Sequence, residues 1–131
     1  MDKTIIITII LIVLAGFLFL GFQTGFFTKI FSGPIKPIPI PEGIILFYGQ
    51  DCPHCKDVED YISQNKIEDK VKFTKLEVWY NKDNQNILAQ IVQKCGIKTD
   101  QVGVPLLWDG SKCYIGEVDA INFFKNAAGI K

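Results

Sequence analysis

Residues 44–55 read IILFYGQDCPHC, and the rest of the chain can be interpreted as a scaffold for the two cysteines at the end of this stretch. The uninterrupted apolar run Ile44–Tyr48 predicts a short buried strand. After Cys52, a proline at the first helical position and apolar residues spaced three and four apart predict a helix over about 54–65. The sequence therefore predicts a cysteine pair where a strand gives way to a helix N-terminus.

Two cysteines at the start of a helix have a specific chemical use. Helix N-termini leave backbone N–H groups unpaired and carry partial positive charge, which favours a thiolate over a thiol. A lowered thiol pKa is what thiol–disulfide exchange needs. His54 lies between the cysteines, where its ring can hydrogen-bond to Cys52 and add a proton dependence near neutral pH, or simply be solvated. We predict that Cys52 and Cys55 form a redox-active disulfide in a thiol–disulfide oxidoreductase, with no metal or organic cofactor.

The other cysteines leave several alternatives open. A CxxC motif also occurs in zinc sites, but Cys95 and Cys113 are too far apart to supply a second close pair. Cys95 shares the apolar stripe of a predicted helix, which is typical of a buried free cysteine. A Cys95–Cys113 disulfide is the alternative, and it would indicate an oxidising compartment. A membrane-tethered copper or zinc chaperone that uses Cys52, Cys55 and His54 remains possible, as does a redox-silent binding module.

Composition excludes some partners. The chain has 131 residues, enough for one small domain beside its N-terminal segment. Its formal net charge is zero, and all 14 basic residues are lysines that form no stripe. Proteins that recognise nucleic acids or phosphate favour arginine and clustered basic residues. We therefore expect no nucleic-acid partner.

Residues 1–31 predict an N-terminal membrane anchor with a helix over about 4–22. No charged residue lies between Lys3 and Lys29, and about 20 helical residues cross a bilayer core of about 30 Å. A cleaved signal peptide would be shorter, and a buried core helix would have a polar face. We predict a single-pass membrane protein whose domain lies outside the cytoplasm. The flanking charges are nearly balanced, so a cytoplasm-facing reductase stays an alternative.

Residues 32–42 predict a proline-rich linker. Four prolines in this stretch fix φ and remove backbone donors, which favours an extended, polyproline-like chain. At about 3.1 Å per residue, the linker would hold the domain roughly 30 Å from the membrane. The domain itself is predicted to occupy residues 43–131.

The elements of this domain are predicted to follow the order βαβαββα. After the first strand and helix come a strand at 71–78, a helix at 81–95, a hairpin of 106–108 with 113–115, and a helix at 117–128. The residues expected to face the core are Val58, Tyr61 and Ile62 in the first helix, Ile87, Leu88, Ile91, Val92 and Cys95 in the second, and Val118, Ile121 and Phe124 in the last.

This order resembles the thioredoxin superfamily, in the compact form found in glutaredoxins. Three features carry the resemblance: a first strand that leads to the Cys-Pro-His-Cys motif at 52–55, Val104-Pro105 at the start of the third strand, and Gly116 before the final helix. The resemblance covers residues 43–131. It implies an α/β, thioredoxin-like fold with a central mixed four-stranded sheet flanked by helices.

The resemblance also implies roles within the motif. The counterpart of Cys52 is an exposed nucleophile that attacks a substrate disulfide, and the counterpart of Cys55 is a buried thiol that resolves the mixed disulfide. Pro53 and His54 at this place are similar to the residues of bacterial periplasmic disulfide donors, which are oxidising. The direction of electron flow is left open.

A substrate-facing wall is implied beside the motif. The resemblance predicts a cis bond between Val104 and Pro105, so that the backbone of Val104 can pair with an incoming peptide. Tyr48 and Gly116 are further candidates for substrate contact. Glutaredoxins usually carry a lysine shortly before the first cysteine and a double glycine before the last helix, and both are missing here. We therefore predict protein thiols and disulfides as substrates, together with a membrane or soluble redox partner that resets the site.

Overall fold

The computed structural model describes residues 2–23 and 38–130, which belong to two compact units, 1–37 and 38–131. The first unit contains helix α1 (Lys3–Gln23), of 21 residues. In the described ranges, no helix is both long and apolar enough to cross a membrane, so the predicted transmembrane helix is not confirmed. Residues 24–37, which hold the end of the predicted anchor and most of the predicted linker, lie outside the described part.

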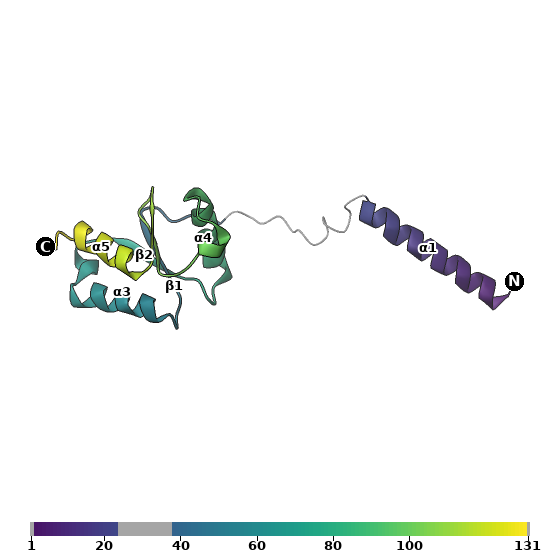
Figure 1. Ribbon diagram of the computed structural model, residues 1–131, viewed down its shortest axis with the longest axis horizontal. Coiled ribbons are helices and arrows are strands. Elements are labelled where there is room, and N and C mark those ends of the chain that lie inside the picture. Colours follow the sequence, from purple (N-terminus) through teal and green to yellow (C-terminus); the bar gives the residue numbers. More distant parts are fainter. Residues whose placement is uncertain (1, 24–37, 131) are drawn as a thin grey trace. The chain divides into compact units, whose positions relative to one another are not determined.

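The second unit is built around a mixed four-stranded sheet (Figure 1). The strands lie in the order β2-β1-β3-β4, with β1 parallel to β2 and antiparallel to β3, and β3 antiparallel to β4. Their order along the chain confirms the predicted βαβαββα arrangement and the thioredoxin-like fold. The elements are β1 (Ile44–Tyr48), α3 (Pro53–Gln64), η1 (Ile67–Asp69), β2 (Phe73–Glu77), α4 (Lys82–Lys94), η2 (Thr99–Gln101), β3 (Leu106–Trp108), β4 (Cys113–Ile115) and α5 (Glu117–Ala127).

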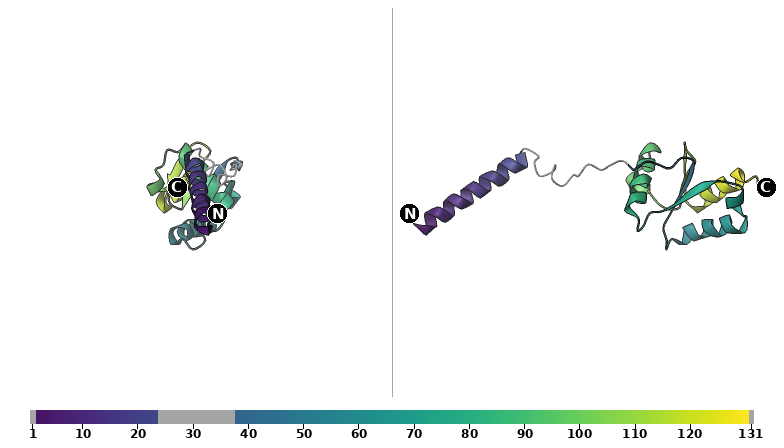
Figure 2. Two further views of the ribbon diagram at one scale, coloured as in Figure 1. Left: turned by 90° about the vertical axis from the view of Figure 1, so that its right-hand side faces the viewer. Right: turned by 180° about the vertical axis from the view of Figure 1, so that it is seen from behind.

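Helices cover both faces of the sheet, with α4 on one face and α3 and α5 on the other (Figures 1 and 2). In β1, Ile45 and Phe47 belong to the core on the α4 side, and Leu46 belongs to the core on the α3 and α5 side. All three side chains are almost fully buried. A strand buried on both faces requires a continuous apolar run. This is why apolar and polar residues do not alternate in residues 44–48.

Helix α5 differs from its predicted orientation. Phe124 faces the core as expected and Ile121 packs against it, but Val118 is 68% exposed, and Ala120 is buried in its place. At about 100° per residue, Val118 lies on the opposite side of the helix from Ala120. The spacing of Val118, Ile121 and Phe124 predicted that all three share one buried face of the helix. In the structure, the centre of that buried face is the pair Ala120 and Phe124.

The compact domain begins before the first strand. Ile38 and Ile40 pack against the core on the α4 side, and the Gln90 side-chain amide donates a hydrogen bond to the Ile38 carbonyl at 3.1 Å. This packing extends the domain back from Gly43, where the sequence placed its start, to Ile38.

Cys95 and Cys113 form a disulfide. Cys95 is the C-cap residue of α4, and Cys113 is the first residue of β4. The bond therefore ties the α4 layer to the outer strand of the sheet. Of the two possibilities that the sequence left open for Cys95, the structure has the disulfide.

Strand β2 lies at the other edge of the sheet and carries a charged cluster. The Lys75 ammonium is 3.6 Å from the Glu59 carboxylate of α3 and 3.8 Å from the Glu68 carboxylate of η1. All three side chains are well exposed, so each pair contributes at most about 1 kcal/mol to stability.

Gly49 follows β1 at a point where there is no room for a side chain. A methyl group there would come within 2.6 Å of the indole Nε1 of Trp79. We expect Gly49→Ala to lower the free energy of unfolding by about 2 kcal/mol, because the ring must be displaced. Urea unfolding followed by circular dichroism would measure the change.

Gly103→Ala is a matched control, because a methyl group at Gly103 meets no atom within 4 Å. It should leave the unfolding midpoint nearly unchanged. Equal midpoints for the two variants would contradict the close packing of Trp79 on Gly49.

Candidate active site

Cys52 occupies the N-cap position of α3. Its backbone is extended, with φ −84° and ψ 115°, and its Sγ accepts a hydrogen bond from the Cys55 backbone N–H at 3.3 Å. Side chains at N-caps commonly accept such a bond, because the first backbone N–H groups of a helix have no partner within it. Pro53 fits the first turn because it has no N–H to leave unpaired. The predicted arrangement of the cysteine pair at a helix N-terminus is therefore confirmed.

Cys55 lies in the first turn of α3 and faces the core. Its side chain is 2% exposed. Burial, followed by the hydrogen bond with Cys52, raises the pKa of the Cys55 thiol from the ordinary 9.0 to about 12. The Cys55 thiol therefore keeps its proton at neutral pH, which sets it apart chemically from Cys52. The resemblance implied an exposed nucleophile at Cys52, but in the structure Cys52 is also buried, with 7% exposure.

The loop before β3 passes directly beside Cys52. The Val104–Pro105 peptide bond is cis, as predicted. The Cys52 Sγ lies 3.6 Å from the Val104 carbonyl oxygen. Pro105 is buried, and its carbonyl accepts a hydrogen bond from the Gly116 N–H at 2.8 Å. The motif at 52–55 and the loop at 104–105, about fifty residues apart in the sequence, thus meet at one sulfur atom.

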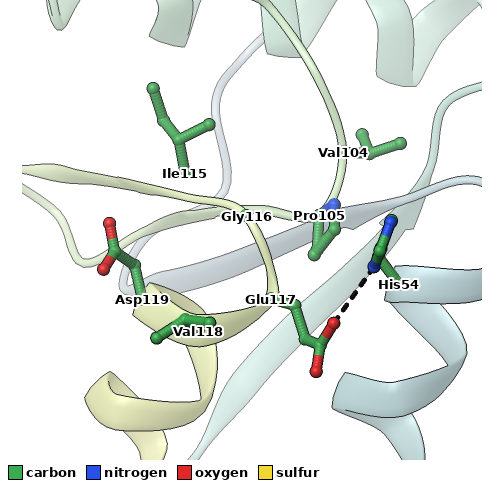
Figure 3. A pocket seen from close by; sticks show the side chains of 8 residues that line it. All are labelled: His54, Val104, Pro105, Ile115, Gly116, Glu117, Val118 and Asp119. Atoms are coloured by element: carbon green, nitrogen blue, oxygen red, sulfur yellow. Dashed lines mark hydrogen bonds and ion pairs between the residues drawn. The ribbon is translucent and has the colours of Figure 1, made fainter.

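A groove of about 380 Å³ lies along the cis Val104–Pro105 bond (Figure 3). Val104, Pro105 and Gly116, three of the predicted substrate-contacting residues, line it together with His54. Tyr48, the fourth, is half-buried at the end of β1, opposite Glu77 of β2, and does not line this groove. The remaining lining residues are Ile115, Glu117, Val118 and Asp119.

His54 has a partner that the sequence did not predict. Its Nδ1 lies 3.1 Å from the Glu117 carboxylate at the start of α5 (Figure 3). The His54 side chain is 72% exposed and that of Glu117 is 32% exposed. No hydrogen bond between His54 and Cys52 occurs in the described part of the chain. The two partners are 63 residues apart, so no local pattern could have indicated the contact.

One group of side chains has the composition of a metal site. His54, Asp57 and Glu117 place possible ligand atoms within 4.8 Å of one another. Among the described residues, this is the only such group of three or more, and it does not include Cys52 or Cys55. The ligand set that the metal-chaperone alternative needs, with His54 beside both thiols, is therefore not assembled here.

Two exposed aromatic residues, Trp79 and Tyr80, contact the segment that precedes Cys52. Tyr80 donates a hydrogen bond to the Asp51 carboxylate at 2.9 Å, and this bond raises the pKa of Tyr80. Trp79 packs over Gly49. Trp79 and Tyr80 are 45% and 68% exposed, so both aromatic side chains are accessible near the residue that precedes Cys52.

No protein-family model matches the sequence, and no curated protein matches it. Solved structures of glutaredoxins do match. Oxidised glutaredoxin 2 from Chlamydomonas reinhardtii is 20% identical, with a TM-score of 0.45, over 66% of this chain and 74% of that one. A buckwheat glutaredoxin–glutathione complex is 22% identical, with a TM-score of 0.44, over 66% and 70%. Reduced glutaredoxin C1 from Populus tremula x tremuloides is 15% identical, with a TM-score of 0.45, over 67% and 68%. At these identities and TM-scores, the similarity carries no argument about the activity of this chain.

The raised pKa of Cys55 predicts how stability depends on pH. The folded, reduced protein holds the Cys55 proton more tightly than the unfolded chain does. The contribution of the Cys55 thiol to the free energy of unfolding is fully present below pH 9, and it is lost as the pH rises towards about 12. Urea midpoints of the reduced protein should therefore fall more steeply above pH 9 than those of Cys55→Ala. Parallel pH profiles for the two proteins would contradict this prediction.

Proposed function

We propose that residues 38–131 form a thiol–disulfide oxidoreductase that exchanges the Cys52 and Cys55 dithiol, or its disulfide, with protein substrates. The observation that carries the proposal is the asymmetry of the pair. Cys52 caps the helix with its Sγ 3.6 Å from the carbonyl oxygen of Val104, a residue that lines the groove, and Cys55 is the more deeply buried of the two cysteines. A nucleophile must be reached by its substrate, whereas a resolving thiol has to reach only the first sulfur.

The proposed exchange has two steps. The Cys52 thiolate attacks one sulfur of a substrate disulfide, which forms a mixed disulfide and releases the other substrate sulfur as a thiolate. Cys55 then loses its proton and attacks the Cys52 sulfur. This releases the second substrate thiolate and forms the Cys52–Cys55 disulfide, so two electrons have passed to the substrate. The reverse sequence oxidises a substrate dithiol and leaves Cys52 and Cys55 reduced.

The pKa of Cys55 supports this order of steps. Burial is the largest cause of the raised pKa, and the hydrogen bond with Cys52 and the charge of Cys52 raise it further. The two causes that involve Cys52 disappear once Cys52 is part of a mixed disulfide, so the pKa of Cys55 falls at the step that requires its thiolate, while the effect of burial remains. Before that step, the buried thiol remains protonated and does not compete for substrate.

Two measurements test the proposal. The purified protein should catalyse reduction of a disulfide-linked reporter peptide in the presence of a recycling dithiol. Equilibration with thiol buffers should give a reduction potential for the Cys52 and Cys55 pair. A value near −120 to −180 mV, as in known disulfide donors and isomerases, indicates a donor, and a value near −270 mV indicates a reductase. No exchange with any reporter would end the proposal.

We further propose that the domain works in an oxidising compartment outside the cytoplasm. The support is the Cys95–Cys113 disulfide, because such bonds are rare in reducing cytosol. Alkylation of free thiols in intact cells, before lysis, should leave Cys95 and Cys113 unmodified. Membrane attachment remains a prediction from the apolar sequence of residues 4–22, and separation of membrane and soluble extracts would test it.

A further inference from the structure

The groove beside Cys52 combines an apolar surface with negative charge. Val104, Pro105, Ile115 and Val118 supply the apolar surface, and Val118 is 68% exposed. An exposed valine on a helix whose opposite side is fully buried provides apolar area that a bound segment could cover. This is the valine that the sequence pattern had assigned to the core.

Two carboxylates lie in the same groove, and no lysine lines it. Glu117 is hydrogen-bonded to His54, and the side chain of Asp119 has no hydrogen bond or ion pair within the described residues. Asp57 lies within 4.8 Å of Glu117, measured between possible ligand atoms. Acidic groups therefore outnumber basic ones along the groove that Val104, the neighbour of the Cys52 sulfur, helps to line.

We infer that the groove selects polypeptide substrates that carry a lysine or arginine next to the reacting cysteine. The inference rests on the proposed oxidoreductase activity and names its substrate class. A basic side chain in the groove would lie near the Asp119 carboxylate, and its methylene groups would cover Val118. An acidic neighbour, or glutathione with its two carboxylates, would be repelled. Charges at a binding surface change the rate at which a charged substrate is captured, and added salt weakens this effect.

Disulfide-linked reporter peptides that differ only at the residue after the cysteine would test the inference on the full chain. With Lys, Gln or Glu at that position, kcat/KM should fall in that order. The Lys and Glu peptides should differ by about tenfold at low ionic strength. The difference should shrink as salt is added to several hundred millimolar. Equal rates for the three peptides would overturn the inference and leave the proposed activity intact, whereas no reaction with any peptide would end both.

Variants that change the charge of Asp119 test whether the selectivity arises in the groove. Asp119→Asn should reduce the ratio of the Lys to the Glu rate, and Asp119→Lys should reverse the order of the peptides. Asp100→Asn removes an exposed carboxylate in η2, outside the groove, and should leave the ratio unchanged. A ratio that is insensitive to both Asp119 variants, or that changes equally with Asp100→Asn, would contradict the assignment.

Discussion

The Cys52→Ser variant is expected to lose thiol–disulfide exchange by about a thousandfold or more. A serine hydroxyl does not ionise near neutral pH and cannot form a mixed disulfide, so the first step is removed. The fold should not suffer, because serine is among the best N-cap residues and can accept the same bond from the Cys55 N–H. The rate with a reporter peptide and the urea midpoint, measured on one preparation, separate the loss of chemistry from loss of structure.

The Cys55→Ser variant should fail differently. Its Cys52 can still attack a substrate, but no thiol follows to release the product, so a mixed disulfide should accumulate. Mass spectrometry under non-reducing conditions would detect one substrate per chain. Because position 55 is buried, Cys55→Ala serves as a second variant that places no hydroxyl in the core. If Cys55→Ala turned over at the wild-type rate, or if Cys52→Ser were the variant that trapped substrate, the assigned roles would be wrong.

Removal of the Cys95–Cys113 disulfide should have the largest effect on stability. The bond closes a loop with a sequence separation of 18, for which chain entropy predicts a contribution of about 3 kcal/mol. The double variant Cys95→Ser/Cys113→Ser should therefore unfold at a clearly lower urea concentration. Exchange activity at low temperature should persist, because neither cysteine lines the groove.

A reductant provides a control that changes no atom other than the sulfurs. In a Cys52→Ser/Cys55→Ser background, adding a dithiol can reduce only the Cys95–Cys113 bond. The free energy of unfolding should fall by a similar amount to that in the double variant. A reductant without effect on stability in this background would show that the bond is absent in solution.

The fold was predictable because its signals are local. The apolar run at 44–48, the hairpin of 106–108 with 113–115 and the glycine before the last helix are each indicated by residues close together in the sequence. Parallel pairing of β1 with β2 follows from the helix that connects them. The Val104-Pro105 bond was predicted by resemblance, and its position beside Cys52 follows once both segments are placed on the same sheet.

The contacts between distant elements were not predictable from local pattern. The His54–Glu117 pair depends on how the first turns of α3 and α5 approach each other, and these two helices pack into the same core. Val118 was assigned to the core because spacing alone does not show where the centre of a buried face lies. Ile38 and Ile40 were assigned to a linker because prolines surround them, although both pack on the α4 side.

Lys75 has a consequence for how the protein behaves when it is concentrated. It lies on β2, one of the two outermost strands, where unpaired backbone groups invite a strand from a second molecule. A charged side chain held there by Glu59 and Glu68 opposes such docking, because aligned strands would bring lysines from both molecules together. The other outer strand, β4, has only three residues and offers a short template. The sheet is thereby protected at both edges against ordered aggregation.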